Sequence, residues 1–143
     1  MVNSLKKILV AFDGSQNSLR GMEKAIQIAK PARATITAVF VIGTPLIKSG
    51  LYNITNTQRN LAKQKAMEIL DRAQGRAKLA KVKFEGKIIS GVPSTAITKF
   101  ADNQKFDIIV IGARGLSGTK SLFLGSVSNH ILHSTKIPVL VVK

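Results

Sequence analysis

The sequence predicts an α/β fold in which a five-stranded parallel sheet is doubly wound, with helices on both faces. Three observations lead to this prediction. Short apolar segments that suit strands alternate along the chain with segments whose apolar residues recur at helical spacing. Several of the apolar segments are continuous, as in strands that are buried on both faces. The length of 143 residues, with no repeat or linker, predicts one domain, residues 1–143.

The first strand and the first helix follow from the pattern near the N-terminus. Residues 8–12 form a continuous apolar run that ends in turn-forming residues, as a buried strand does. Apolar residues then recur at helical spacing over residues 19–29. Ser15 or Asn17 is the expected cap of this helix, and Pro31 is its expected end.

The middle of the chain predicts a strand, a long loop, a helix and a strand. Residues 34–42 are rich in β-branched side chains, which favour a strand. Residues 43–56 contain Gly, Pro, Ser, Asn and Thr without a period, which indicates a long loop. A helix is expected over residues 57–80, and residues 83–89 alternate loosely as a third strand.

The C-terminal part completes the alternation of strands and helices. We expect a short helix over residues 92–100 and a strand over 107–111, followed by a glycine-rich loop. A helix over residues 122–133 and a strand over 138–142 end the chain. Strands separated by helices pair in parallel through right-handed crossovers, so the fold class follows.

Ligands of such sheets lie beyond the carboxyl ends of the strands, where the winding reverses. The loops at this place are residues 13–15 and residues 112–118, which are rich in Asp, Gly and Ser. Two common phosphate motifs do not match. A threonine separates Gly118 from Lys120, which breaks the P-loop pattern, and Gly14 is the one glycine in the turn where a dinucleotide fingerprint needs three.

A different glycine pattern remains, Gly112-x2-Gly115-x9-Gly125-Ser126. Gly112 and Gly115 allow the backbone to approach a ligand closely. Gly125 and Ser126 open a helix, whose first amides and positive dipole end attract an anion. The Ser126 hydroxyl is expected to cap this helix or to donate to a phosphate oxygen, and Arg114 adds a positive charge.

This pattern resembles the ATP-binding motif of the universal stress protein family, and the resemblance extends along nearly the whole chain. Residues 7–15 are similar to the family's opening strand and acidic turn, Gly91-x-Pro93 to the lead-in of its third helix, and residues 137–142 to its closing strand. The resemblance implies an adenine nucleotide alpha hydrolase-like fold with strand order 3-2-1-4-5. It also implies homodimers formed through the last strand, here Val139–Val142.

The resemblance implies a regulatory stress-response protein that holds ATP, with Mg²⁺, between the loops after strands one and four. No catalytic residue and no protein-bound metal is expected, so the protein acts as a switch or sensor. Phe40 and Gly43 depart from the histidine and the acidic residue that the family often has there. The residues that the resemblance places around the nucleotide are Ala11, Phe12, Asp13, Val41, Gly112, Ala113, Arg114, Gly115, Gly125, Ser126, Val127 and Ser128.

The charge of the chain leaves other functions open. The sequence has 22 Lys and Arg against 7 Asp and Glu, a net charge of +15, which attracts anions of any kind. Basic residues are dense over residues 59–87, as on a solvated helix face or a nucleic-acid footprint. The alternatives are therefore a basic module that binds nucleic acid or an acidic partner, with a vestigial nucleotide site, and a slow ATPase. Few aromatic residues and no Trp are present, so a stacking platform is not expected.

The remaining features favour plain structural roles. The absence of Cys excludes disulfides and cysteine metal sites, and no apolar stretch is long enough to cross a membrane, so we expect a cytoplasmic protein. His130 and His133 lie three residues apart on a helix, and without a third histidine we expect them on its surface. The alternative interpretation is that Asp13 is a turn residue alone, that the glycines form a plain loop and that Arg114 is a solvated side chain.

Overall fold

A computed structural model describes residues 4–43, 56–115 and 124–143 and confirms the predicted fold. Five parallel strands form one sheet in the order β3-β2-β1-β4-β5. The strands are β1 (Lys7–Ala11), β2 (Thr35–Gly43), β3 (Lys83–Gly91), β4 (Ile108–Gly112) and β5 (Val139–Val142). The helices are α1 (Gln16–Ala32), α2 (Asn56–Ala80), α3 (Pro93–Asn103) and α4 (Ser126–Ser134).

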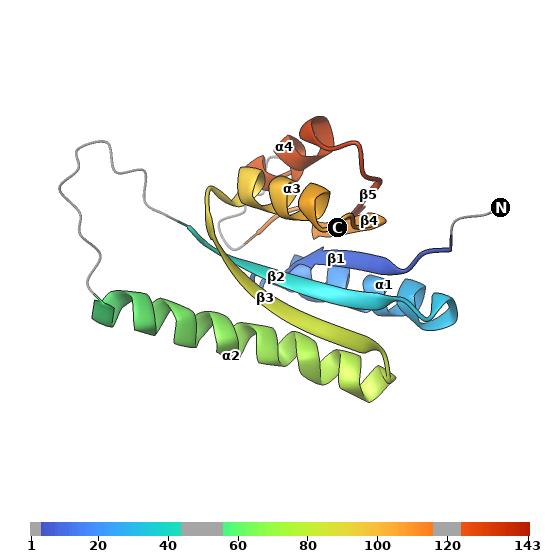
Figure 1. The fold of residues 1–143 in the computed structure, drawn as a ribbon, viewed down its shortest axis with the longest axis horizontal. Coiled ribbons are helices and arrows are strands. Elements are labelled where there is room, and N and C mark those ends of the chain that lie inside the picture. Colours follow the sequence, from blue (N-terminus) through green and yellow to red (C-terminus); the bar gives the residue numbers. More distant parts are fainter. Residues whose placement is uncertain (1–3, 44–55, 116–123) are drawn as a thin grey trace.

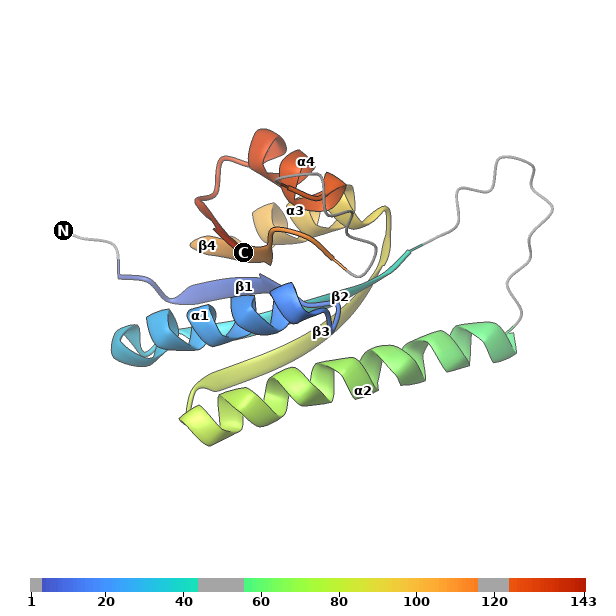
Figure 2. The same ribbon diagram turned by 180° about the vertical axis from the view of Figure 1, so that it is seen from behind.

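The helices cover both faces of the sheet. Helices α1 and α2 lie on one face, and α3 and α4 lie on the other (Figure 1, Figure 2). Successive residues of a strand point to opposite faces. Ile8 and Val10 of β1 therefore pack into the core beneath α1 and α2, whereas Leu9 packs into the core beneath α3 and α4. The continuous apolar run at residues 8–12 is explained by this burial on both sides.

The first helix ends later than its proline. The expectation that Pro31 ends it is wrong, because Pro31 lies inside α1 and the helix continues to Ala32. A proline in the last turn removes a single N–H bond, which a packed helix tolerates. The chain leaves the helix at Arg33, which has a φ of 54°, and the Arg33 N–H donates to the carbonyls of Ala29 and Lys30.

The last helix begins later than the sequence predicts. Leu124 and Gly125 are not helical, and Gly125 is the N-cap of α4. Residues 44–55 of the predicted loop at 43–56 lie outside the described residues. Residues 116–123, which belong to the predicted loop and helix after β4, also lie outside them. In the described part of the chain, no helix is long and apolar enough to cross a membrane.

Candidate functional site

A cavity lies at the carboxyl ends of the central strands β1 and β4, where the winding of the sheet reverses. It encloses about 410 Å³. Every residue that the sequence analysis placed around a nucleotide lines this cavity, although these residues come from four separate segments of the chain. The structure adds six lining residues that the sequence analysis missed, namely Ser15, Ser18, Val39, Pro93, Ile97 and Ile111.

The turn after β1 holds Asp13 in a fixed orientation. The Ser15 N–H donates to Oδ1 of Asp13 over 2.9 Å. The Ser15 hydroxyl in turn accepts the Ser18 N–H at 3.2 Å and caps α1, so Ser15 is the cap and Asn17 is not. Gly14 permits this turn because its φ is +84°, a conformation that side chains disfavour. Asp13 is thus a turn residue and also a half-buried wall of the cavity.

The second oxygen of Asp13 faces the loop after β4. A Cβ atom added at Gly115 would lie 2.8 Å from Oδ2 of Asp13, which is closer than real contacts allow. Gly115 therefore leaves room for the carboxylate of Asp13 to stand between the two loops. Residues of both loops that flank the crevice line the cavity, as the sequence pattern predicts.

The carbonyl of Ala113 closes the loop after β4. It accepts the Gly125 N–H at 2.6 Å and the Ser128 hydroxyl at 2.9 Å, while the Ala113 N–H donates to the Val142 carbonyl at 2.7 Å. The hydroxyl of Ser128 is buried and also reaches the Gly125 carbonyl at 3.1 Å. These bonds join Ala113 to the start of α4. The Gly125 N–H and the Ser128 hydroxyl therefore donate to protein carbonyls in this structure.

Ser126 and Val127 form the first turn of α4 at the cavity wall. Because Gly125 is the N-cap, the expectation that the Ser126 hydroxyl caps the helix is wrong. The amides of the first turn of a helix have no partner within the helix. The contact of Ser126 with a phosphate oxygen stays a prediction, and its exposed position leaves the hydroxyl accessible for it.

Gly112 has a packing role. A Cβ atom at this position would lie 2.8 Å from Cβ of Asn17 and 2.9 Å from its backbone carbonyl carbon. The missing side chain therefore lets the first turn of α1 lie directly against the end of β4. Gly125 is less crowded, since its added Cβ atom would lie 3.3 Å from the Ala113 oxygen.

The cavity has an apolar wall and an end that attracts anions. Val39 and Val41 of β2 and Ile97 of α3 form part of the apolar wall. Three helices begin at the cavity, because Ser15 caps α1, Pro93 opens α3 and Ser126 opens α4, and helix N-termini carry partial positive charge. Such a cavity suits a ligand that joins a flat apolar group to an anionic one.

The missed residues had signals in the sequence. Val39 lies two positions before Val41 and therefore points to the same face of the sheet. Ile97 lies four positions after Pro93, one helical turn away on the same face of α3. Neither signal can be used until the strand order places β2 and α3 beside the crevice.

The two histidines of the chain do not line the cavity. His130 and His133 are exposed on α4, which confirms their surface position. Among the described residues, no group of three or more His, Cys, Asp or Glu side chains lies close enough to hold a metal ion.

Comparison with known proteins agrees with this geometry. A model of the universal stress protein family matches residues 4–143. A universal stress protein of Methanocaldococcus jannaschii is 34% identical over 142 residues, covering 99% of this chain and 84% of the relative. Universal stress protein UspA from Lactobacillus plantarum shares the fold, with a TM-score of 0.83 at 21% identity over 99% of this chain and 100% of the other. A universal stress protein solved in complex with cAMP has a TM-score of 0.73 at 29% identity, covering 99% and 98% of the two chains. The chain therefore belongs to the universal stress protein family.

Proposed function

We propose that this protein binds ATP in the cavity between the loops after β1 and β4 and acts as a nucleotide-dependent switch in the stress response. The observation that carries the proposal is the cavity itself, which joins an apolar wall from β2 and α3 to the N-termini of three helices. The relative solved with cAMP supports an adenine nucleotide as the ligand class. The proposal keeps the cytoplasmic location expected from the sequence.

The two ends of the nucleotide match the two parts of the cavity. The adenine lies against the apolar side chains at the end of β2, including Val41, with Asp13 beside the base and the ribose. The phosphates lie along Gly115 and the first turn of α4, where Arg114, Ser126 and Val127 line the wall. Phosphate oxygens and water supply most ligands of a nucleotide-bound Mg²⁺, which suits a cavity lined by a single carboxylate among the described residues.

We expect binding without fast turnover. In-line hydrolysis needs a group that orients the attacking water and a charge at the γ-phosphate. Asp13 is the one carboxylate among the described residues of the cavity, and the proposal places it at the base end of the ligand. A slow ATPase is the alternative, and it uses the same site.

The test is calorimetric titration of the full chain with Mg-ATP, AMP and cAMP, at low salt and at near-physiological salt. Gly125→Val adds a branched side chain at the cavity wall, and the normal φ of −73° at this position accepts it. Gly75→Val is the matched control, because nothing lies within 4 Å of an added Cβ atom on that exposed part of α2. Circular dichroism shows whether both variants are folded.

The proposal predicts micromolar ATP binding that survives the salt, is kept by Gly75→Val and is lost in Gly125→Val. Tighter binding of AMP or cAMP than of ATP would keep the site but overturn ATP as its ligand. Binding that salt abolishes, or that a folded Gly125→Val protein retains, would overturn the site, because the surface charge of the chain alone would then explain the attraction.

The proposal includes a homodimer formed through β5. This strand is one edge of the sheet, and its residues Val139, Leu140 and Val141 are only half-buried. An apolar edge strand presents unpaired backbone groups and favours pairing with a second strand. Pairing of β5 with its copy would cover this edge and leave the cavity of each protomer open.

A further inference from the structure

The three non-glycine residues with positive φ in the described chain are all basic. They are Arg33, Lys81 and Lys105, with φ values of 54°, 59° and 55°. Left-handed backbone is unfavourable for residues with a Cβ atom, and glycine or asparagine is the usual choice at the end of a helix. A long basic side chain at each of these positions is therefore less favourable for the backbone conformation than glycine or asparagine would be.

These residues occupy the same place in three identical turns. Arg33 and Lys81 directly follow α1 and α2, and Lys105 lies two residues after the end of α3. Each donates its N–H to the carbonyl three residues earlier, at 3.1 to 3.3 Å. The next residue donates to the carbonyl five residues earlier, at 2.9 to 3.1 Å. The turns lead into β2, β3 and β4, which run parallel in one sheet. All three turns therefore lie at the amino end of the sheet, opposite the cavity.

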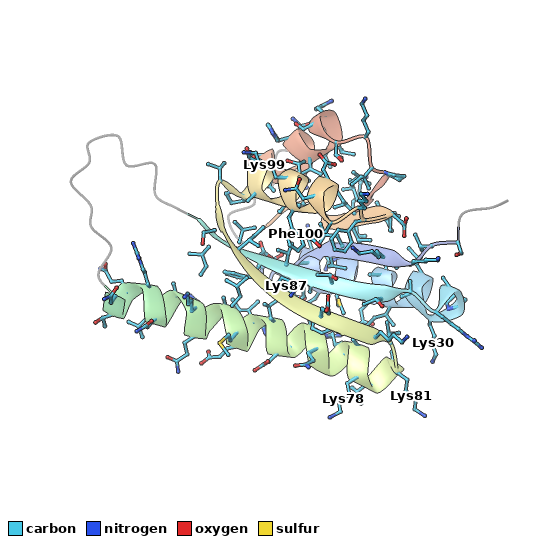
Figure 3. The ribbon with its side chains drawn as sticks, in the orientation of Figure 1. Lys30, Lys78, Lys81, Lys87, Lys99 and Phe100 are labelled. Carbon is cyan, nitrogen blue, oxygen red and sulfur yellow. The ribbon has the colours of Figure 1, made fainter. Side chains whose placement is uncertain are left out.

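Other basic residues share this end. Figure 3 shows Lys30, Lys78 and Lys81 toward the end of the molecule where α1 and α2 terminate, while Lys87 and Lys99 lie farther along the surface. We name the exposed basic residues in the last turns of α1 and α2, in the turns that precede the strands and at the strand starts the amino-end face. Its members are Lys6, Lys30, Arg33, Lys78, Lys81, Lys83, Lys105 and Lys136.

Little negative charge opposes this face. Asp107 is held by the chain itself, since its Oδ2 atom accepts the N–H groups of Lys6 and Lys7 at 2.9 and 2.8 Å. Asp102 is exposed at the end of α3, and Glu85 is exposed two residues after Lys83 in β3, so few carboxylates stand against the eight basic residues of the face. Lys7 is not counted in the face, because its ammonium group donates to the Gln104 carbonyl and lies 4.7 Å from the centre of the Phe106 ring.

We infer that the amino-end face binds the phosphate backbone of double-stranded nucleic acid, independently of its sequence. Cations without apolar neighbours suit phosphates, which supply most of the affinity in such complexes. A membrane surface would need several exposed apolar side chains beside the charges, and of the large ones exposed in the described chain only Leu79 and Leu132 lie at this end. A single strand would need exposed aromatic rings, whereas Phe106 is buried.

The structure also offers a purely local explanation. Cations near the C-terminus of a helix stabilise the helix dipole, so Arg33, Lys81 and Lys105 would then serve stability alone. The two explanations differ in what the charges contact. Local stabilisation predicts a lower melting temperature and unchanged binding when the charges are removed, whereas the proposed face predicts a loss of binding.

The test is fluorescence anisotropy with labelled duplexes of unrelated sequence, one set of DNA and one of RNA, titrated with the full chain at several salt concentrations. The variant Arg33→Asn/Lys81→Asn/Lys105→Asn removes three charges with a residue that accepts left-handed backbone. The control Arg59→Gln/Lys63→Gln/Lys65→Gln removes the same charge from exposed positions near the start of α2. Circular dichroism and thermal unfolding show that each variant is folded.

We expect the wild type to bind duplexes of all sequences, and the asparagine variant to bind at least tenfold more weakly. On DNA, its salt dependence should flatten by about 0.9 per lost phosphate contact, while the control keeps most of the affinity. Preference for DNA or RNA would identify the source of the phosphates. Absence of duplex binding, or equal losses in both variants, would overturn the proposal, and so would binding to anionic lipid vesicles alone. Gly125→Val should bind duplexes normally, so this result is separate from that of the nucleotide site.

Discussion

Replacing Gly112 by alanine tests whether the first glycine of the loop is needed for packing. The added Cβ atom would lie 2.8 Å from Cβ of Asn17 and 2.9 Å from its carbonyl carbon, whereas ordinary contacts begin at 3.4 Å. One of these atoms is backbone and the other is attached to it, so no change of rotamer relieves the contact. Helix α1 or strand β4 must move by several tenths of an ångström.

The expected loss of stability follows from this displacement. Overpacking of a well-packed interior costs about 1–3 kcal/mol. An unfolding entropy of about 2.1 cal/mol/K per residue over the 143 residues gives ~0.3 kcal/mol/K. The melting temperature should therefore fall by roughly 3–10 °C, because the free energy of unfolding divided by this entropy sets the shift.

The assay is thermal unfolding of Gly112→Ala beside Gly75→Ala, followed by circular dichroism or calorimetry. An added Cβ atom at Gly75 meets nothing within 4 Å, and alanine is a better helix former by about 0.5–1 kcal/mol, so this control should melt slightly higher than the wild type. A Gly112→Ala protein with the melting temperature of the wild type would refute the close approach of α1 to β4. Loss of ATP binding at unchanged stability would instead assign Gly112 to the ligand.

Three further substitutions test other contacts. Gly115→Ala places a Cβ atom 2.8 Å from Oδ2 of Asp13 and should weaken ATP binding about tenfold, with little change in melting temperature. Calorimetric titration measures the affinity, and an affinity equal to that of the wild type would contradict the close approach of Asp13. Ser128→Ala removes the buried bond to the Ala113 carbonyl and should lower the free energy of unfolding by about 1 kcal/mol in chemical denaturation, while an unaltered midpoint would show that the bond is dispensable. Val141→Lys places a charge in β5 and should convert the proposed dimer to a monomer in light scattering, and a dimer that persists would move the interface elsewhere.

Most of the fold could be predicted because the apolar pattern is strong and local. Residues 8–12 and 108–111 are continuous apolar runs. The observed strands β1 and β4 lie within one residue of the predicted ranges 8–12 and 107–111. The end of α1 was predicted less well. Pro31 is a helix-breaking residue in isolation, but packing of α1 against the sheet and the left-handed turn at Arg33 decide where the helix stops.

The lining of the candidate cavity could largely be predicted from the sequence, whereas the structural roles of several lining residues could not. The glycine pattern placed Gly112 and Gly125 beside a ligand because the order of elements brings their loops to one end of the sheet. The contact of Gly112 with Asn17, and that of Ser128 with Ala113, join residues far apart in the sequence. No local pattern encodes such contacts, so a packing glycine and a ligand-contacting glycine look alike in the sequence.

Both ends of this sheet carry features that attract anions, and those of the carboxyl end alone follow from the parallel topology. At the carboxyl end, helix N-termini lie at a cavity of about 410 Å³, which suits a small anion such as the proposed nucleotide. At the amino end the helices present their C-termini, which are partially negative, so any attraction there must come from side chains. Arg33, Lys81 and Lys105 supply that charge from three turns at once. Exposed charges spread over separate turns match a long polyanion better than a single phosphate, which is why ATP and a duplex should not compete for this protein.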